Sequence, residues 1–393
     1  MQTPYLKFLH TPKGSDAVFY QEKDRIFCRI LHGQAAAPLL LAEHTLPRFS
    51  LCRYRDYTYL LYTTQQGEVT LSASPDLYRW EPRVLFRQES RQPISYFMVP
   101  QQDALHLIYH QPIGNTGIHG LMYTVYRQGQ CQKPYCIDHF LPSPSIIFQA
   151  KRLSENHLIL YYRSAKTTLS ARELLLSPFT VGSLSPLAQT SSPWLDLSIH
   201  DHGEKIHLLY LVRNLFRTQV LYRYRQTSAM SRPRLIWEGV GCTSCLLTQQ
   251  KEVLSLLWTA GGETFRCIST DNGHTFGPVE SLTEDLPPAL EKGRLVSDPS
   301  ESFAEETLGN PEWFYLPDGI SSQSEQQSIS AAEAHREELS RLLSQKETQM
   351  QQAEQNWRQQ MAQLEARLSS LRLENERLRQ KEAPSASEAP SEE

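Results

Sequence analysis

The chain has 393 residues, of which 40% are hydrophobic and 21% are charged, a balance that is ordinary for a protein with a packed core. Its formal net charge of −4 gives no general affinity for polyanions, so the composition does not indicate nucleic-acid binding. No apolar run approaches the roughly 20 residues that a membrane helix needs, and residues 1–16 lack the apolar core of a signal peptide. We therefore expect a cytoplasmic protein.

Six segments of the sequence share one pattern: an apolar run, a polar turn and a second apolar run that ends in an aromatic residue. The final aromatic residues, 42 to 52 residues apart, are Tyr20, Tyr62, Tyr109, Tyr161, Tyr210 and Trp258. A second hairpin and a fourth short apolar run follow, as in "GEVTLSAS" and "RVLF". Runs rich in Tyr, Leu, Ile and Val, separated by Gly, Asn, Asp and Pro, indicate β-strands. Four strands in a period of about 45 residues are typical of a β-propeller blade.

The repeat therefore predicts an all-β, six-bladed β-propeller over residues 1–282. A β-sandwich, the competing all-β fold, would not need six similar units. The loops of a propeller divide between two faces. Turns that join the first and second strands share one face with the turns between the third and fourth strands, and the loops after the second and fourth strands form the opposite face.

The stretch "CISTDNGHTF" (267–276) follows the third strand of the sixth unit and predicts a structural turn. Asp and Ser side chains bond to backbone N–H groups within a turn, Gly allows a positive φ, and an aromatic residue packs back on the sheet. A shorter copy without the Gly lies at the same place in the second unit. The turn residues are Ser269, Asp271, Gly273, Thr275 and Phe276 in the first stretch and Ser74, Asp76 and Trp80 in the shorter copy.

This stretch resembles the Asp-box, or BNR, repeat of the sialidase superfamily, in which Ser-x-Asp-x-Gly-x-Thr precedes Trp or Phe. The resemblance implies a sialidase-like propeller and places the motif on the face away from the sialidase substrate. It also implies that an active member needs three arginines for the substrate carboxylate, a Tyr activated by a Glu, and an acidic Asp. The first unit contains no Arg-Ile-Pro segment, and no Tyr–Glu couple is singled out by spacing. We therefore expect no catalytic residues.

Two groups of possible metal ligands have simpler interpretations. The cluster His200, Asp201 and His202 fills a turn between a first and a second strand, where a solvated turn is expected. Cys242 and Cys245 form a CxxC pair within an apolar strand, and a zinc site would need four ligands. With seven widely spaced cysteines we also expect no disulfide framework. The sequence predicts no metal and no cofactor.

Ligand-binding residues are expected on the face formed by the loops after the second and fourth strands. Several arginines converging there would favour a carboxylate or a phosphate, because a guanidinium binds both groups through two hydrogen bonds. The candidate ligand-binding residues are Arg48, Arg87, Arg91, His110, Asn115, Arg163, Arg213 and Arg217.

The composition changes after the repeat. Residues 283–328 mix Pro, Gly, Ser and acidic residues, which indicates a linker, with "PEWFYLPDG" as an apolar island docked on the propeller. Residues 329–381 contain no Pro or Gly and carry a heptad pattern, which predicts a long α-helical coiled coil. Residues 382–393 predict a disordered acidic tail. The predicted core positions of the coiled coil are Leu343, Met350, Trp357, Leu364, Leu371, Asn375 and Leu378.

The coiled coil sets the expected assembly. A buried Asn375 is satisfied by the same residue of a second chain in a parallel dimer, so we expect a parallel homodimer, with a trimer as the alternative. The favoured function is a non-catalytic propeller scaffold that binds a protein or an acidic sugar and is oligomerised by the coiled coil. The alternative is a sialidase-like glycoside hydrolase acting on an acidic sugar, and a third hypothesis is a structural spacer.

Overall fold

The computed structural model describes residues 5–315 apart from gaps at 12–15, 32–36, 89–91, 102, 115, 142–147, 202–204, 227–228, 251–252, 283–285, 288–289 and 297–305, together with positions 357, 360–361, 363–364, 367–375 and 377. The chain divides into two compact units, Met1–Gln326 and Gln327–Glu393. Among the described residues, no helix combines the length and the apolar character that spanning a bilayer requires.

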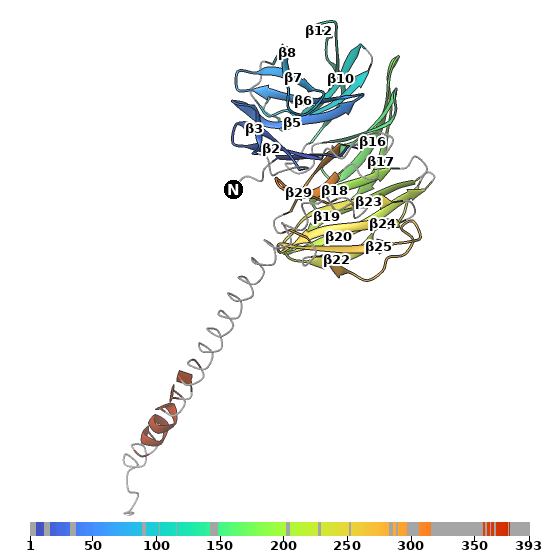
Figure 1. Cartoon of the computed structure of the whole chain (residues 1–393). Helices are drawn as coiled ribbons and strands as arrows, with labels where there is room; N and C mark the ends of the chain where they lie inside the picture. The colour runs from blue at the N-terminus through green and yellow to red at the C-terminus, as the bar shows by residue number, and fades with distance from the viewer. Residues whose placement is uncertain are drawn as a thin grey trace, which may run out of the picture. The chain divides into compact units, whose positions relative to one another are not determined.

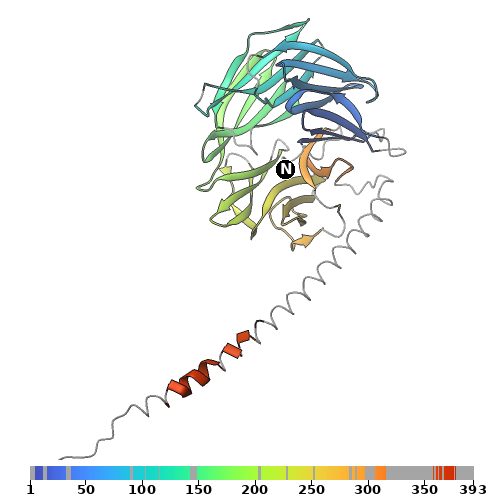
Figure 2. The same ribbon diagram turned by 90° about the vertical axis from the view of Figure 1, so that its left-hand side faces the viewer.

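The first unit is built from six β-sheets arranged around a common centre (Figures 1 and 2), and we number them blades 1 to 6 in chain order. In each sheet at least four consecutive strands pair antiparallel, which confirms the six-bladed propeller that the repeat predicts. Blade 2 contains β5 (Thr45–Tyr54), β6 (Tyr57–Thr64), β7 (Glu68–Ser74) and β8 (Glu81–Arg87). Blade 4 contains β14 (Gln149–Ser154), β15 (His157–Ala165), β16 (Thr168–Leu176) and β17 (Phe179–Gln189).

Blades 3, 5 and 6 vary this plan at their outer edges. Blade 3 contains β9 (Tyr96–Gln101), β10 (Ala104–Pro112), β11 (His119–Arg127), β12 (Gln130–Cys131) and β13 (Tyr135–Phe140). Blade 5 contains β18 (Trp194–Asp201), β19 (Lys205–Asn214), β20 (Arg217–Gln226), β21 (Ala229–Met230) and β22 (Arg234–Gly239). Blade 6 contains β23 (Cys242–Gln250), β24 (Val253–Ala260), β25 (Glu263–Ser269) and β26 (Glu280–Ser281).

The core lies between neighbouring blades. Strand β19 is an example, because its sequence is almost continuously apolar. Successive side chains of a strand point to opposite faces. Leu208 and Tyr210 pack with residues of blade 4, whereas Leu209 and Leu211 pack with residues of blade 6 around Trp258. Because both faces of the strand are covered, a strictly alternating apolar and polar pattern would leave polar groups buried.

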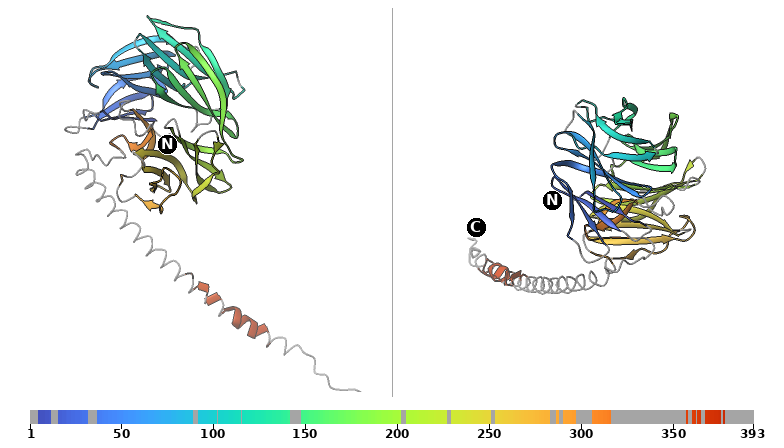
Figure 3. Two further views of the ribbon diagram at one scale, coloured as in Figure 1. Left: turned by 90° about the vertical axis from the view of Figure 1, so that its right-hand side faces the viewer. Right: turned by 45° about the horizontal axis from the view of Figure 1, so that its top comes forward.

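Blade 1 is larger than the repeat predicts (Figure 3). Its expected strands are β1 (Tyr5–Leu9), β2 (Ala17–Glu22), β3 (Arg25–Ile30) and β4 (Leu39–Ala42). Three further strands continue the sheet from β1, namely β27 (Glu291–Val296), β28 (Glu306–Asn310) and β29 (Trp313–Phe314). These strands lie in the range 283–328, where the sequence predicts a linker, and β27 pairs in parallel with β1 through Lys7 and Arg294. We call β27, β28 and β29 the axial segment.

The axial segment is fixed to β1 by the ring of Phe8. The ring lies over Gly293 and Gly309, and a Cβ atom at either glycine would lie 2.5 Å from a ring carbon of Phe8. Phe314, which belongs to the apolar island predicted to dock on the propeller, packs on Phe8 with ring centroids 5.2 Å apart. On the other side, Leu308 packs with leucines of blade 6. The axial segment thus belongs to the propeller core.

In the second unit, the described positions between 357 and 377 are helical. The apolar side chains at the predicted core positions are exposed in the single chain, 57% for Leu364 and 55% for Leu371. A single helix does not test pairing, so the coiled coil and the homodimer stay predictions. The predicted core positions Leu343, Met350 and Leu378, and the acidic tail at 382–393, lie outside the described residues.

Candidate functional site

Most of the arginines predicted to bind a ligand do not come together. Arg87 pairs with Glu68 (2.5 Å) and Arg217 with Glu238 (3.5 Å), each within its own blade. The guanidinium of Arg163 donates through Nε and Nη2 to the carbonyl oxygen of Leu141 (3.1 and 2.9 Å). Arg213 is exposed at the end of β19. The predicted residues Arg91 and Asn115 lie outside the described residues.

Two of the predicted residues, Arg48 and His110, do lie together between blades 2 and 3. Arg48 Nη1 donates to Ser95 Oγ (3.1 Å), and the backbone N–H of Ser95 donates to His110 Nε2 (3.1 Å). His110 Nδ1 lies 2.8 Å from His119 Nδ1. The sequence analysis did not single out His119, which begins β11 directly opposite Pro112 at the end of β10.

The inner edge of blade 1 adds three residues that sequence reasoning missed. Lys7 Nζ lies 4.9 Å from the ring centroid of Tyr5 on the same strand. Arg294, the parallel partner of Lys7 on β27, places its guanidinium carbon 4.4 Å from the ring centroid of Phe97 in blade 3. Tyr5 interacts electrostatically with Lys7, Arg48 and Arg294. We call Tyr5, Lys7, Arg48 and Arg294 the basic cluster.

The pKa values in the basic cluster reflect positive charge at partly buried positions. Burial lowers the pKa of Lys7, and the charge of Arg294 lowers it further, against the opposing effects of Tyr5 and of the Glu306 carboxylate. Burial also lowers the pKa of Arg48. For Tyr5 burial alone would raise the pKa, but the charges of Lys7, Arg48 and Arg294 bring it below its usual value. Among the described residues, no carboxylate forms an ion pair with Lys7, Arg48 or Arg294.

The two histidines next to the basic cluster act as neutral groups. Burial lowers the pKa of His110 to about 3, and the charge of Arg48 and the nearby His119 contribute in the same direction. Burial and Arg48 also lower the pKa of His119. Neutral imidazoles can each donate and accept one hydrogen bond, so they add polar groups to the site without adding charge.

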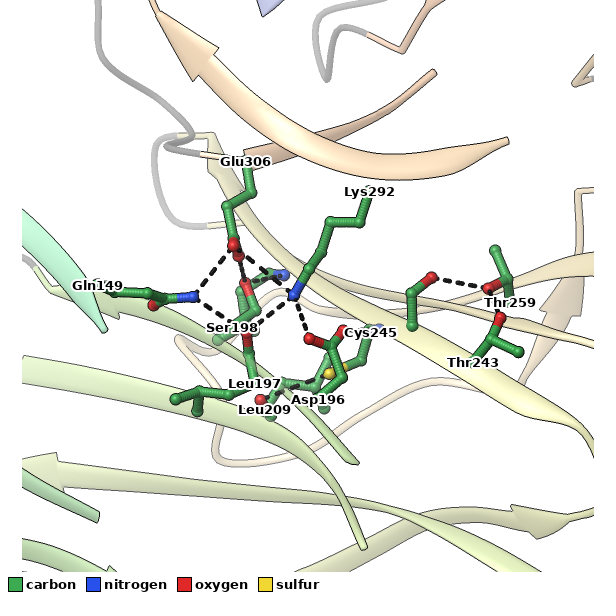
Figure 4. Close-up of polar contacts among 12 residues, drawn as sticks. Gln149, Asp196, Leu197, Ser198, Leu209, Thr243, Cys245, Thr259, Lys292 and Glu306 are labelled. Atoms are coloured by element: carbon green, nitrogen blue, oxygen red, sulfur yellow. Dashed lines mark hydrogen bonds and ion pairs between the residues drawn. The ribbon is translucent and has the colours of Figure 1, made fainter. Parts of the chain in front are cut away.

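Lys292, which also belongs to the axial segment, is neutralised by carboxylates of the protein (Figure 4). Lys292 Nζ donates to Asp196 Oδ1 and to the carbonyl oxygen of Leu197, each at 2.8 Å, and lies 3.6 Å from Glu306 Oε1. Gln149 and Ser198 donate to Glu306 at 3.0 and 2.7 Å. The network joins blades 1, 4 and 5. Although burial opposes it, the charges of Asp196 and Glu306 raise the pKa of Lys292.

The turn around Asp271 has the hydrogen bonds expected from its residue types. Asp271 accepts from the side chain of Ser269 (2.7 Å) and from the side chain and backbone of Thr275 (2.5 and 2.8 Å). Gly273, at φ +85°, donates its N–H to Ser269 Oγ (2.7 Å). Phe276 packs edge-on against Tyr222 of blade 5, with ring centroids 4.8 Å apart. The hydrogen-bond partners of Asp271 in this set therefore all lie within its own turn.

The shorter copy in blade 2 is built in the same way. Asp76 accepts from the backbone N–H groups of Tyr78 and Arg79, both at 2.9 Å. Ser74 accepts from the N–H of Leu77 (2.9 Å). Trp80 packs edge-on against Phe19 of blade 1, with ring centroids 5.9 Å apart. In both copies the aromatic residue therefore anchors its turn on the preceding blade.

Where the structure describes them, the candidate metal ligands are buried structural residues. His200 and Asp201 lie in β18, so the expectation of a solvated turn there is wrong. Tyr161 donates a hydrogen bond to the Asp201 carboxylate, and Lys151 donates to the Asp201 carbonyl oxygen. His202 lies outside the described residues. Cys245 is fully buried and its thiol contacts the carbonyl oxygen of Leu209. In the part of the chain that the structure describes, no group of three or more His, Cys, Asp and Glu residues could hold a metal ion.

One carboxylate on the axial segment titrates near neutrality, because burial raises the pKa of Glu291 to about 7. A raised pKa in the folded state adds stability below the unfolded value of 4.5, and this stability is lost as the pH rises through 7. We therefore expect Glu291→Gln to increase the free energy of unfolding at pH 8 by about 1–2 kcal/mol, after allowance for solvent screening, and to change it little at pH 4.5. Urea unfolding at both pH values measures this, with exposed Glu263→Gln as the control. Equal effects at both pH values would contradict the assignment.

The first unit is a six-bladed β-propeller in which the basic cluster joins residues of blades 1 and 2. No family model matches the chain, and no curated protein matches it.

Solved structures do resemble it. The BP39L lectin from Burkholderia pseudomallei superposes with a TM-score of 0.52 at 11% identity, over 75% of this chain and 89% of the lectin. The fucose-binding lectin of Aleuria aurantia, described as a six-bladed β-propeller, superposes with a TM-score of 0.45 at 10% identity, over 73% of this chain and 98% of the lectin. An ulvan lyase of polysaccharide lyase family 25 superposes with a TM-score of 0.44 at 11% identity, over 66% of this chain and 74% of the lyase. At such identities the likeness to the Burkholderia lectin concerns the fold alone. The sialidase resemblance stays a prediction.

Proposed function

We propose that this chain is a non-catalytic binding propeller whose ligand contacts the basic cluster together with His119. The observation that carries the proposal is the convergence of donors from separate strands: Tyr5 and Lys7 from β1, Arg294 from β27, and Arg48 from β5. Such donors match a ligand rich in oxygen acceptors, and saccharides belong to this class. The fold shared with the Burkholderia lectin is compatible with a saccharide-binding scaffold.

A glycoside hydrolase, the alternative, needs two carboxyl groups beside the substrate. Glu291 carries a raised pKa, but it alternates with Arg294 along β27 and therefore points to the opposite face of that strand. The tyrosine–carboxylate pair of Tyr162 and Asp138 is also unsuited, because Tyr162 is fully buried and burial raises its pKa. A binding role therefore fits the described residues better than a hydrolase role.

A binding screen tests this function. The full-length chain is titrated with neutral and acidic saccharides and with acidic metabolites, and binding is followed by calorimetry. We expect at least one ligand to bind, and Arg48→Ala to weaken that binding while Arg213→Ala, an exposed arginine outside the cluster, leaves it unchanged. Binding that is insensitive to Arg48→Ala would place the ligand elsewhere. Release of a product from any saccharide would support the hydrolase instead.

We also propose that the C-terminal helix pairs two copies of the chain. Positions 357, 361, 364, 368, 371 and 375 recur at intervals of three and four, so they share one face of a helix. Among them Leu364, Leu368 and Leu371 are exposed in the single chain. Burying this face against a second helix would remove it from water, and two linked propellers would bind a multivalent ligand with higher avidity.

Light scattering measures this assembly directly. We expect the full-length chain to have twice the mass of one chain, and removal of residues 329–393 to yield a single chain. Replacing Leu364 and Leu371 by Lys should have the same effect, whereas Lys at the exposed position Leu373, outside the predicted core, should not. A single-chain mass for the full-length protein would contradict the pairing.

A further inference from the structure

Two cations on the same strand of the axial segment have opposite surroundings. Lys292 and Arg294 lie two residues apart on β27, so their side chains point to the same face of the strand. Lys292 contacts the carboxylates of Asp196 and Glu306. Arg294 lies instead against the Phe97 ring and beside Lys7, its partner on β1. The protein therefore neutralises one cation of the pair and leaves a positive charge at the other.

Arg48 completes this concentration of positive charge from the side of blade 2. Its backbone lies at φ +81°, a conformation that is uncommon for a residue with a side chain. Gln21 Oε1 accepts the Arg48 backbone N–H (2.9 Å), while Gln21 Nε2 donates to Thr45 Oγ1 and to the Leu46 carbonyl oxygen, each at 3.0 Å. The buried Gln21 side chain thus fixes the backbone that presents Arg48 to Tyr5 and Ser95. Strained backbone held by its surroundings is typical of functional sites.

Partly buried cations of like sign repel one another and are costly without a counter-ion. Three such cations interact electrostatically with Tyr5, whose hydroxyl can itself donate a hydrogen bond. We propose that the basic cluster binds an anionic group of the ligand, a carboxylate, sulfate or phosphate, which acts as the counter-ion of Lys7, Arg48 and Arg294. This inference rests on the proposed function and names the charge that its ligand carries.

The position of the cluster gives the anion a second effect. Lys7 and Arg294 come from the first strand of the propeller and from the axial segment, which pair in parallel. An anion held between them removes their repulsion and so stabilises the pairing of β1 with β27. Because a ligand that binds only the folded state stabilises it by mass action, anion binding raises the melting temperature.

Matched probes test the inference on the full-length chain. Glucuronate and glucose differ in one carboxylate, and sodium sulfate and inorganic phosphate provide the anion alone, with sodium chloride at equal ionic strength as the reference. We expect glucuronate to bind at least tenfold more tightly than glucose, and sulfate or phosphate to raise the melting temperature above the chloride reference. Arg294→Met, which keeps an apolar stem against Phe97, should weaken anion binding on the order of 10-fold to 100-fold. Arg213→Met should leave it within about twofold.

The outcomes separate this inference from the proposed function. If a neutral saccharide binds in an Arg48-dependent manner while glucuronate gains nothing over glucose, the binding function stands and the anion site is wrong. If sulfate binding depends on Arg294 while no saccharide binds, the anion site stands and the saccharide ligand is wrong. If Arg294→Met does not fold, Lys7→Met is used as the test variant in the same titration. Undiminished anion binding by the folded Lys7→Met protein would overturn the anion site.

Discussion

Replacing Lys292 by Met is expected to lower the free energy of unfolding by about 3–5 kcal/mol, the range for breaking a buried ion pair by removing one partner. Asp196 and Glu306, both mostly shielded from solvent, would lose their positive neighbour. Asp196 would keep the N–H of Cys245 (2.9 Å), and Glu306 would keep Gln149 and Ser198. Hydrogen bonds alone do not neutralise two carboxylates at such positions, so most of the cost remains.

A surface ion pair of similar length serves as the control for this result. Arg266 pairs with Glu280 at 2.9 Å on the outer part of blade 6, where the acid is half exposed. Arg266→Met should therefore cost less than about 1 kcal/mol. Urea unfolding of both variants at pH 7 gives the comparison. Equal losses would mean that the network around Lys292 does not hold the axial segment in place.

Replacing Gly309 by Ala is expected to lower the free energy of unfolding by about 3 kcal/mol, at the upper end of the usual cost of overpacking. The added Cβ would lie 2.5 Å from the Phe8 ring, 2.6 Å from the carbonyl oxygen of Trp313 and 2.7 Å from the Cβ of Phe314. One of these atoms belongs to the backbone and another is the first side-chain carbon of a buried residue. Neither can rotate away, so the strand itself must shift.

Gly277 provides the matched control, because a Cβ there would meet only the Ile268 carbonyl oxygen at 3.6 Å, an ordinary contact. Gly277→Ala should leave the melting temperature nearly unchanged or slightly raised, since Ala restricts the unfolded chain more than Gly does. Thermal unfolding of the two variants separates the effects. A Gly309→Ala protein as stable as Gly277→Ala would show that Phe8 does not depend on close contact with the axial segment.

The blades could be predicted from the sequence because each hairpin is local and carries its own turn. The pairing of β1 with β27 could not be predicted in this way. The strands β27 to β29 are short, and their sequence is interrupted by Gly, Ser and Pro, so composition alone indicates a linker. Their stability comes from contacts with Phe8 and Asp196, which are distant in sequence and leave no periodic pattern.

The site was predictable only in part for a similar reason. Arg48 and His110 were found because propeller geometry assigns their loops to one face. Arg87 and Arg217 were assigned to loops of the same type, but each meets a glutamate on the neighbouring strand of its own blade, Glu68 and Glu238. Such pairings depend on side-chain register at a strand end, which the blade repeat does not specify. Arg294 was missed because its strand was missed.

The parallel pairing of β1 with β27 also bears on how the protein is made. The two strands are separated by about 290 residues, so their contact closes a very long loop. A ribosome must complete all six blades and the axial segment before the first strand can bind its last neighbour. Until then Phe8 and Leu6 lack Leu295 and Phe314, which pack against them in the finished propeller. The first blade of the nascent chain therefore stays incomplete through most of synthesis. Its unpacked apolar residues are the surface that a chaperone would be expected to cover.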